Sequence, residues 1–169
     1  MFKKKKGYTL VEVIAVMAII AVLTIGVGVV SVRNVRKANI DQTASDLQIF
    51  STNMGDAYYE LGAPVIDPAG TDGSAQFQNY LTELQNSYMN CTFDMTSIEA
   101  TSNGFKVDFA SPTDAFDNQF TMWCTTKEGL DPYIMIVSGG PDGAIDTSNY
   151  DDQDYGDDIV MIIHPKSTT

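Results

Sequence analysis

Apolar residues dominate one uninterrupted stretch near the start of the chain. From Val13 to Val32 no residue is charged. At 1.5 Å per residue, such a stretch makes a helix of about 30 Å, close to the thickness of the hydrocarbon core of a bilayer. Basic residues flank it on both sides: Lys3, Lys4, Lys5, Lys6, Arg33, Arg36 and Lys37. The pattern predicts a membrane-inserted helix with the four leading lysines on the cytoplasmic side.

Beyond Lys37 the apolar positions keep a helical spacing but occupy one side only. Gly62-Ala63-Pro64 then predicts the end of the helix. We therefore expect one helix from about Thr9 to Leu61, about 80 Å long, whose second half packs against a globular head. The residues of this apolar stripe are Ile40, Ala44, Leu47, Phe50, Met54, Ala57, Tyr58 and Leu61.

The remaining residues predict a head with one short helix followed by strands. Helical spacing after an N-cap at Ser74 predicts a helix over residues 75–88. From Cys91 onward the apolar period changes to two, which predicts antiparallel strands. The order of helices and then strands predicts an α+β fold in which a small antiparallel sheet lies on the long helix. The expected strands cover residues 91–95, 105–109, 119–125, 132–137 and 158–164, with a turn at 127–129.

Charge is divided sharply between the two parts of the 169-residue chain, whose length suits one modest domain and an appendage. Residues 1–37 hold seven basic residues and one acidic residue, a net charge of +6, whereas residues 38–169 hold three basic and 21 acidic residues, a net charge of −18. An acidic body repels phosphate backbones, so nucleic acid is not expected as the main partner. Outside a cell, the acidic region of residues 38–169 favours the binding of divalent cations.

The one acidic residue of the first part, Glu12, stands directly before the apolar stretch. Together with Thr9 it has the spacing of a capping box, in which each side chain bonds the backbone of the other. A carboxylate at membrane depth costs about 2–3 kcal/mol unless it is paired. We therefore expect Glu12 to have a cationic partner.

A second acidic feature is the segment between Ser138 and Ile159, where glycines and Pro141 lie among seven aspartates. Calcium binds six to eight oxygens from carboxylates and carbonyls in flexible geometry, which such a loop can supply. The spacing does not fit an EF-hand. The alternative is a solvated acidic loop that holds no specific ion. The aspartates are Asp142, Asp146, Asp151, Asp152, Asp154, Asp157 and Asp158.

Candidate chemistry elsewhere in the chain is sparse. His164 is the only histidine, and no nucleophile–base set and no phosphate-binding glycine loop can be proposed, so we do not expect an enzyme. The two cysteines, Cys91 and Cys124, predict one disulfide if the head faces an oxidising compartment. The alternative is two buried thiols on neighbouring strands.

The N-terminus resembles the leader and first residues of type IV pilins and type II secretion pseudopilins. The resemblance lies in the basic leader and the segment Lys6-Gly7-Tyr8-Thr9-Leu10-Val11-Glu12-Val13-Ile14. It implies that a prepilin peptidase cleaves after Gly7 and methylates the new N-terminus at Tyr8, a position that the family more often fills with phenylalanine. It also implies that Glu12 neutralises the N-terminal amine of a neighbouring subunit during assembly. The chain would then comprise a leader (1–7), a transmembrane and assembly half of the helix (8–37) and an extracytoplasmic head (38–169).

Two segments of the head extend the resemblance to major pseudopilins. Residues 114–120 keep an aspartate, an asparagine and two aromatic residues of a family motif but lack its prolines. Residues 138–143 and 156–159 look like the C-terminal calcium loop of those proteins. Alignment with that loop implies a structural Ca²⁺ held by the Gly139 carbonyl and the carboxylates of Asp142, Asp157 and Asp158. The insertion between residues 143 and 156 is long. Asp146, Asp151 or Asp154 are therefore alternative ligands for the ion.

The resemblance implies a structural subunit of a type IV filament, with type II secretion and type IV pili both open. Its implied partners are copies of itself through the N-terminal helix, the prepilin peptidase, a membrane assembly platform, minor pilins or pseudopilins, and the cytoplasmic membrane. The subunit would cross that membrane once, N-terminus inside, and later join an extracytoplasmic or surface filament. Two alternatives compete: a cleaved secretory signal peptide, and a signal anchor that tethers a monomeric extracellular calcium-binding domain.

Overall fold

The fold is taken from a computed structural model. It describes residues 9–64, 66–70, 72–126, 132–147 and 155–163, without the side chains of residues 24–29. The chain divides into two compact units, residues 1–38 and 39–169. The helix α1 (Leu10–Leu61) contributes to both units. The leader, Tyr8, the expected turn at 127–129 and His164 lie outside the described residues.

The first unit contains the N-terminal part of α1. Its described large apolar side chains are exposed in the isolated chain, from 44% at Val13 to 77% at Leu10. Within the described part of the chain, no helix has the combination of length and apolar content needed to cross a membrane.

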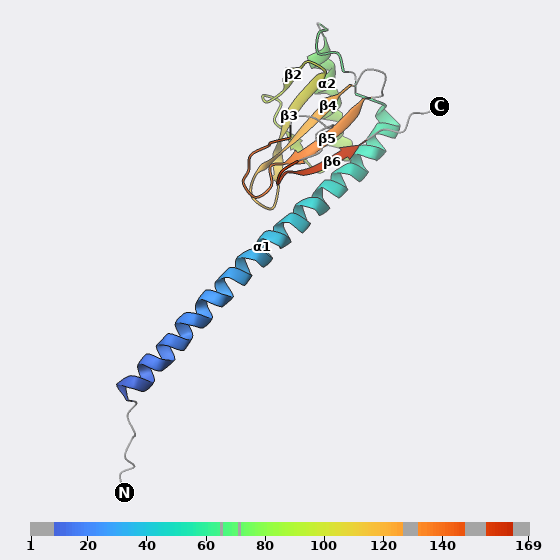
Figure 1. The fold of residues 1–169 in the computed structure, drawn as a ribbon. Coiled ribbons are helices and arrows are strands. Elements are labelled where there is room, and N and C mark those ends of the chain that lie inside the picture. Colours follow the sequence, from blue (N-terminus) through green and yellow to red (C-terminus); the bar gives the residue numbers. More distant parts are fainter. Residues whose placement is uncertain (1–8, 65, 71, 127–131, 148–154, 164–169) are drawn as a thin grey trace. The chain divides into compact units, whose positions relative to one another are not determined.

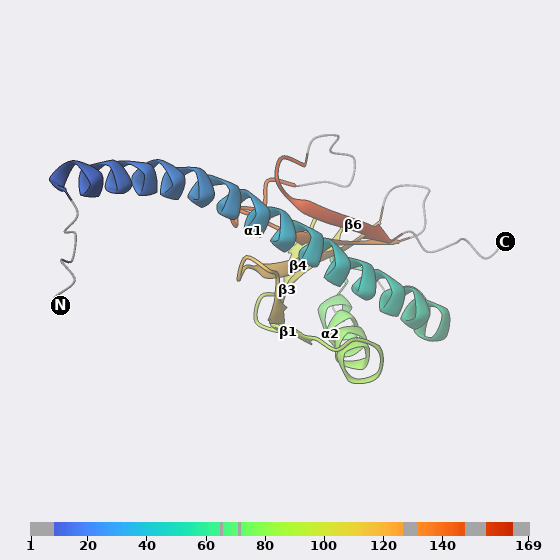
Figure 2. The ribbon, with the colours of Figure 1, turned by 90° about the horizontal axis from the view of Figure 1, so that it is seen from below.

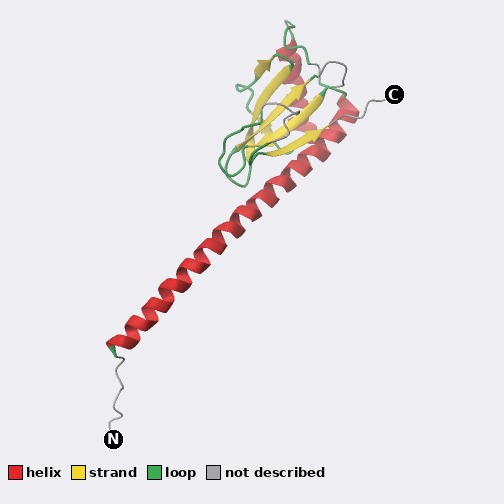
Figure 3. Cartoon of the chain, in the orientation of Figure 1, coloured by secondary structure: helices red, strands yellow, loops and turns green. Residues whose placement is uncertain are grey.

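The second unit is an α+β head in which helices and strands form separate layers (Figure 3). The C-terminal part of α1 and the helix α2 (Gly73–Glu83) lie against one face of a sheet (Figure 2). A single π-helical turn, η1 (Leu84–Tyr88), continues α2. The fold class is thus confirmed, whereas the stripe on α1 is confirmed only in its central part, because Ile40, Ala44 and Leu61 are exposed. The stripe residues that enter the core are Leu47, Phe50, Met54 and Ala57.

The sheet is antiparallel, and its main path runs β1-β3-β4-β5-β6, with β2 paired to β3. Figure 1 shows β3, β4, β5 and β6 side by side in this order. Its helix-facing side carries the core, in which the ring of Phe50 lies 5.4 Å from the rings of both Phe109 and Phe120. The other side carries a smaller apolar cluster of Tyr133, Met135 and Val137. The strands are β1 (Thr92–Phe93), β2 (Glu99–Thr101), β3 (Gly104–Thr113), β4 (Gln119–Thr125), β5 (Tyr133–Ser138) and β6 (Ile159–Ile163).

Two details of the head differ from expectation. The second helix begins at Gly73 after Asp72, which makes no side-chain cap bond, so the expected N-cap at Ser74 is wrong. Strand β2 was not expected, and β3 continues beyond residue 109. The end of α1 agrees with expectation: Gly62 has a φ of 80°, in the left-handed region, and its N–H donates to the carbonyl of Tyr58 over 3.0 Å.

Candidate functional site: the start of α1 and the loop after β5

The start of α1 forms the capping box expected from the sequence. The backbone N–H and the hydroxyl of Thr9 donate to Oε2 of Glu12, over 2.8 and 3.0 Å. In return, the backbone N–H of Glu12 donates to the Thr9 hydroxyl oxygen over 3.3 Å. Since these bonds use Oε2 alone, Oε1 of Glu12 stays available to a group outside this turn.

In the head, Asp114 organises the turn between β3 and β4. This carboxylate is only 4% exposed, and its Oδ1 accepts hydrogen bonds from the backbone N–H groups of Phe116 (2.9 Å) and Asn118 (2.8 Å). The backbone N–H of Ala115 donates to the hydroxyl of Thr43 on α1 over 3.2 Å. One turn is thereby fixed both internally and to the long helix.

The same carboxylate reaches the first residues of the loop that follows β5. The Ser138 hydroxyl donates to Oδ2 of Asp114 over 2.5 Å and accepts from the Gly140 N–H over 3.1 Å. The side-chain amide of Asn118 donates to the Gly140 carbonyl over 2.9 Å. Gly140 has a φ of 58°, and a Cβ at this position would lie 2.1 Å from the Asp157 carbonyl oxygen. The loop therefore starts from a fixed position.

Further along this loop, three carboxylates converge. Asp142, Asp146 and Asp157 each place an oxygen within 4.8 Å of the others. No ion pair to any of the three is present among the described residues. Like charges this close repel one another, and a bound cation would offset that repulsion. Oxygen-only donor sets of this kind suit a hard divalent ion.

Asp158 stands beside this acidic group and has a different environment. Its Oδ2 accepts three hydrogen bonds from the loop: from the N–H groups of Asp146 (3.0 Å) and Thr147 (2.7 Å) and from the Thr147 hydroxyl (2.6 Å). Its Oδ1 is buried and has no hydrogen-bond partner. One oxygen therefore orders the loop, and the other remains to be satisfied.

The structure thus gathers some of the expected ligands more closely than others. Asp142 and Asp157 meet, and Asp146 joins them as one of the expected substitutes. The Gly139 carbonyl accepts the N–H of Gly143 over 3.0 Å. Asp151 and Asp154 lie outside the described residues. Sequence reasoning missed Thr43 and Ser138, whose roles depend on contacts across more than 20 positions of the chain.

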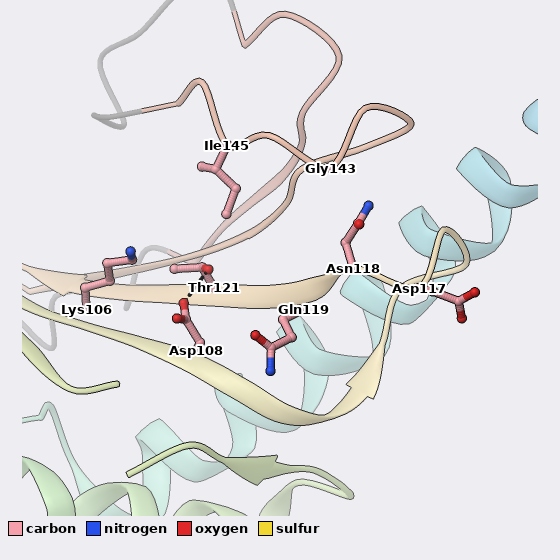
Figure 4. Close-up of a pocket in the computed structure, with 8 residues that line it drawn as sticks. All are labelled: Lys106, Asp108, Asp117, Asn118, Gln119, Thr121, Gly143 and Ile145. Carbon is pink, nitrogen blue, oxygen red and sulfur yellow. Dashed lines mark hydrogen bonds between the residues drawn. The ribbon is translucent and has the colours of Figure 1, made fainter. Parts of the chain in front are cut away.

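A shallow cleft of about 470 Å³ opens on the outer side of the sheet, beside the base of the loop (Figure 4). Its floor carries Lys106, Asp108 and Thr121, and Ile145 points toward them from the loop. The Thr121 hydroxyl donates to Oδ1 of Asp108 over 2.6 Å. The Lys106 ammonium lies 5.8 Å from the centre of the Trp123 ring. Among the described residues lining the cleft, no histidine or cysteine accompanies the hydroxyl, so the cleft offers no nucleophile–base pair.

The expected disulfide between Cys91 and Cys124 is not formed. Both cysteines are free thiols, and both are buried. Thr92, the neighbour of Cys91, pairs with Ser111, whereas Cys124 pairs with Phe105 at the other end of β3. Six residues of strand span about 20 Å, and a disulfide requires Cα atoms about 4.4–6.8 Å apart. Burial raises the pKa of Cys91 to about 12 and that of Cys124 further still.

Comparison with protein-family models gives one match, and it falls on the N-terminus. Residues 2–28 match the prokaryotic N-terminal methylation motif. This match supports the resemblance to type IV pilins and pseudopilins, and the long helix on an antiparallel sheet is consistent with it. The motif belongs to structural rather than catalytic proteins and implies a membrane-anchored protein that later becomes surface-exposed. Comparisons with curated proteins and with solved structures found no match.

Proposed function

We propose that this protein is a structural subunit of a type IV filament, processed by a prepilin peptidase and polymerised through α1. The observation that carries the proposal is the methylation motif at residues 2–28, which includes Glu12 at the first turn of α1. Cleavage after Gly7 would leave Tyr8 with a free or methylated amine. In the proposed mechanism, residues 8–37 enter the cytoplasmic membrane and pass from there into the filament core.

The geometry at the start of α1 suits this role. Thr9 fixes Glu12 through one carboxylate oxygen, so the other can meet the amine of a neighbouring copy. A paired charge avoids the cost that an isolated carboxylate would incur at membrane depth. The exposed apolar side chains along this part of α1 provide the surface on which copies would pack. Membrane assembly proteins and minor pilins or pseudopilins are the expected further partners, in either a type IV pilus or a type II secretion system.

The proposal is tested by replacing Glu12. We expect Glu12→Gln to insert into the membrane normally but to block filament formation, because the amide cannot neutralise the neighbour's ammonium. Filaments sheared from cells would be quantified against the cell-associated subunit. Glu60→Gln is a matched control, since Glu60 lies near the other end of the same helix. Filaments from the Glu12 variant in wild-type amounts would refute the proposal.

The N-terminus of the mature protein provides an independent check. Mass analysis should find Tyr8 as the first residue and an added methyl group on its amine. A chain that retains Met1–Gly7 in cells with a prepilin peptidase would favour the alternative, a signal-anchored monomer with an extracellular calcium-binding domain.

We further propose that the loop after β5 binds Ca²⁺ as a structural ion. Asp142, Asp146 and Asp157 would hold the ion, and Oδ1 of Asp158, which has no hydrogen-bond partner, would be a further oxygen ligand beside them. These residues fit the ion because they offer only hard oxygen atoms. When bound, the ion would neutralise the mutual repulsion of the carboxylates and hold the two ends of the loop together.

Melting of the soluble head, residues 38–169, tests the calcium proposal. We expect millimolar Ca²⁺ to raise the melting temperature above that in excess EDTA, because an ion that binds only the folded state stabilises it. Asp142→Asn with Asp157→Asn should remove this increase, whereas the control variant Asp72→Asn, outside the loop, should retain it. Equal melting curves of the wild-type head with and without Ca²⁺ would contradict the proposal and favour a solvated acidic loop.

A further inference from the structure

The cleft on the outer side of the sheet, with a volume of about 470 Å³, is lined by residues of the head alone. Three segments build it. Strand β3 supplies Lys106 and Asp108, β4 supplies Gln119 and Thr121, and the loop after β5 supplies Ile145 (Figure 4). Sites for small molecules usually measure about 300–1,000 Å³, so the cleft is large enough for a small organic ligand.

The polar groups of this cleft keep hydrogen-bonding capacity that the described part of the chain does not use. Oδ1 of Asp108 accepts from the Thr121 hydroxyl over 2.6 Å, whereas Oδ2 accepts from no described residue. The Lys106 ammonium and the side-chain amide of Gln119 likewise have no hydrogen bond or ion pair with described residues. An ammonium donates, a carboxylate accepts and an amide does both. The cleft therefore presents donors and acceptors together.

Apolar side chains border the same cleft. Ile145 points toward its floor from the loop (Figure 4). Both Ile145 and Trp123 are partly buried against the apolar cluster on the outer side of β5. Trp123 follows Thr121 by two positions on β4, so it lies on the same face of the sheet, about 7 Å further along. A ligand in the cleft would thus meet apolar surface as well as polar groups.

Charge narrows the class of ligand. Lys106 is the only basic residue of the head that the structure describes, and the carboxylates of Asp108 and Asp117 line the same cleft. A ligand with a single charge would be attracted by one sign and repelled by the other. Residues 38–169 hold three basic and 21 acidic residues, a net charge of −18, which repels polyanions. The cleft therefore favours a neutral ligand that both donates and accepts hydrogen bonds.

We propose that this cleft binds a neutral saccharide unit. The hydroxyls of a sugar ring donate and accept, and its C–H groups form an apolar face. Oδ2 of Asp108 accepts from one hydroxyl and the Lys106 ammonium donates to another, while the apolar face contacts Ile145 and the exposed part of Trp123. The Thr121 hydroxyl holds the Asp108 carboxylate in place through Oδ1. The proposal uses only residues of the head and stands apart from the filament and calcium proposals.

Titration of the full-length chain with sugars tests the proposal. The chain is kept in a detergent without a sugar headgroup, with millimolar Ca²⁺ present throughout. The probes are glucose, galactose, mannose, N-acetylglucosamine and N-acetylgalactosamine. Trp123 is the only tryptophan of the chain, so its emission reports on the cleft. We expect at least one probe to change this emission saturably at millimolar concentration, and saturation-transfer NMR to detect the same sugar on the protein.

Two variants and two matched controls locate the binding. Lys106→Met keeps the apolar stem and removes the donor, and Asp108→Asn removes the charge of the acceptor. Each should weaken binding about tenfold or more, because a hydrogen bond to a charged group is lost or weakened. The controls should bind like the wild type: Lys37→Met lies in the other compact unit, and Asp72→Asn precedes α2 on the opposite face of the sheet (Figure 2). Unchanged melting temperatures would show that the variants remain folded.

Charged analogues of glucose test the preference for a neutral ligand. Glucuronate carries a carboxylate and glucosamine an ammonium, and we expect neither to bind more tightly than the best neutral sugar. Tighter binding of glucosamine would show that the cleft selects cations through its carboxylates and would overturn the proposal. So would the absence of binding by all five neutral sugars in both measurements, or binding that neither Lys106→Met nor Asp108→Asn weakens.

Discussion

Asp114 joins two turns that are far apart in the sequence. Its carboxylate accepts from two backbone N–H groups of its own turn and from the Ser138 hydroxyl at the end of β5. Buried acceptors of several hydrogen bonds are costly to change, because each donor that loses its partner remains desolvated. A single side chain therefore determines where the acidic loop begins.

Replacing this carboxylate by an amide should destabilise the head. In Asp114→Asn, the group facing Ser138 becomes a donor, and the charge that strengthens the two backbone hydrogen bonds is lost. We expect the free energy of unfolding to fall by about 1.5–3 kcal/mol, measured by urea denaturation of residues 38–169.

Asp117→Asn is the control for this change. Asp117 lies in the same turn but is exposed, and asparagine tolerates its φ of 67°. Both substitutions remove one negative charge. Any difference in stability between the two variants therefore reports the contribution of the buried hydrogen bonds. Equal effects would show that Asp114 acts through charge alone.

At the scale of elements, the sequence predicts those helices and strands whose apolar residues recur at a regular spacing. The helix α1 was expected to within one residue at each end, because the apolar stripe, the Thr9–Glu12 capping box and Gly62 are all local signals. Strand β4 was likewise expected with its observed bounds. In contrast, β2 has only three residues, none of them buried, so it shows no alternation that could be read.

The candidate site was only partly predictable for a different reason. Local composition marks an acidic, glycine-rich loop, and the three carboxylates that meet are among the residues expected or named as substitutes. Composition does not show which of them approach one another. That depends on Asn118 and Ser138, which position the loop from other elements.

At the scale of the whole molecule, both thiols report on the integrity of the head. Burial raises the pKa of Cys91 to about 12, and Cys124 is completely buried. At pH 8 almost no thiolate exists in the folded state, and only the thiolate is reactive. Because the pKa is raised, reactivity should increase only as the pH approaches the folded-state value or as the head unfolds.

We therefore expect iodoacetamide at pH 8 to modify neither cysteine of the native head, and both after denaturation without a reducing agent. Mass spectrometry counts the adducts. Two adducts on the native head within minutes would contradict the burial of these thiols. No adduct on the denatured, unreduced head would show that the cysteines are joined after all.

Strand β5 has a consequence for how much sequence change the head can accept. All six of its residues are buried, because the core covers one side and the Met135 cluster covers the other. On β3, by contrast, Lys106 and Asp108 alternate with buried residues. In a library of random substitutions, tolerated polar changes should recur at every second position along β3 and be rare throughout β5. Selection on this protein should accordingly leave β5 among its slowest-changing segments.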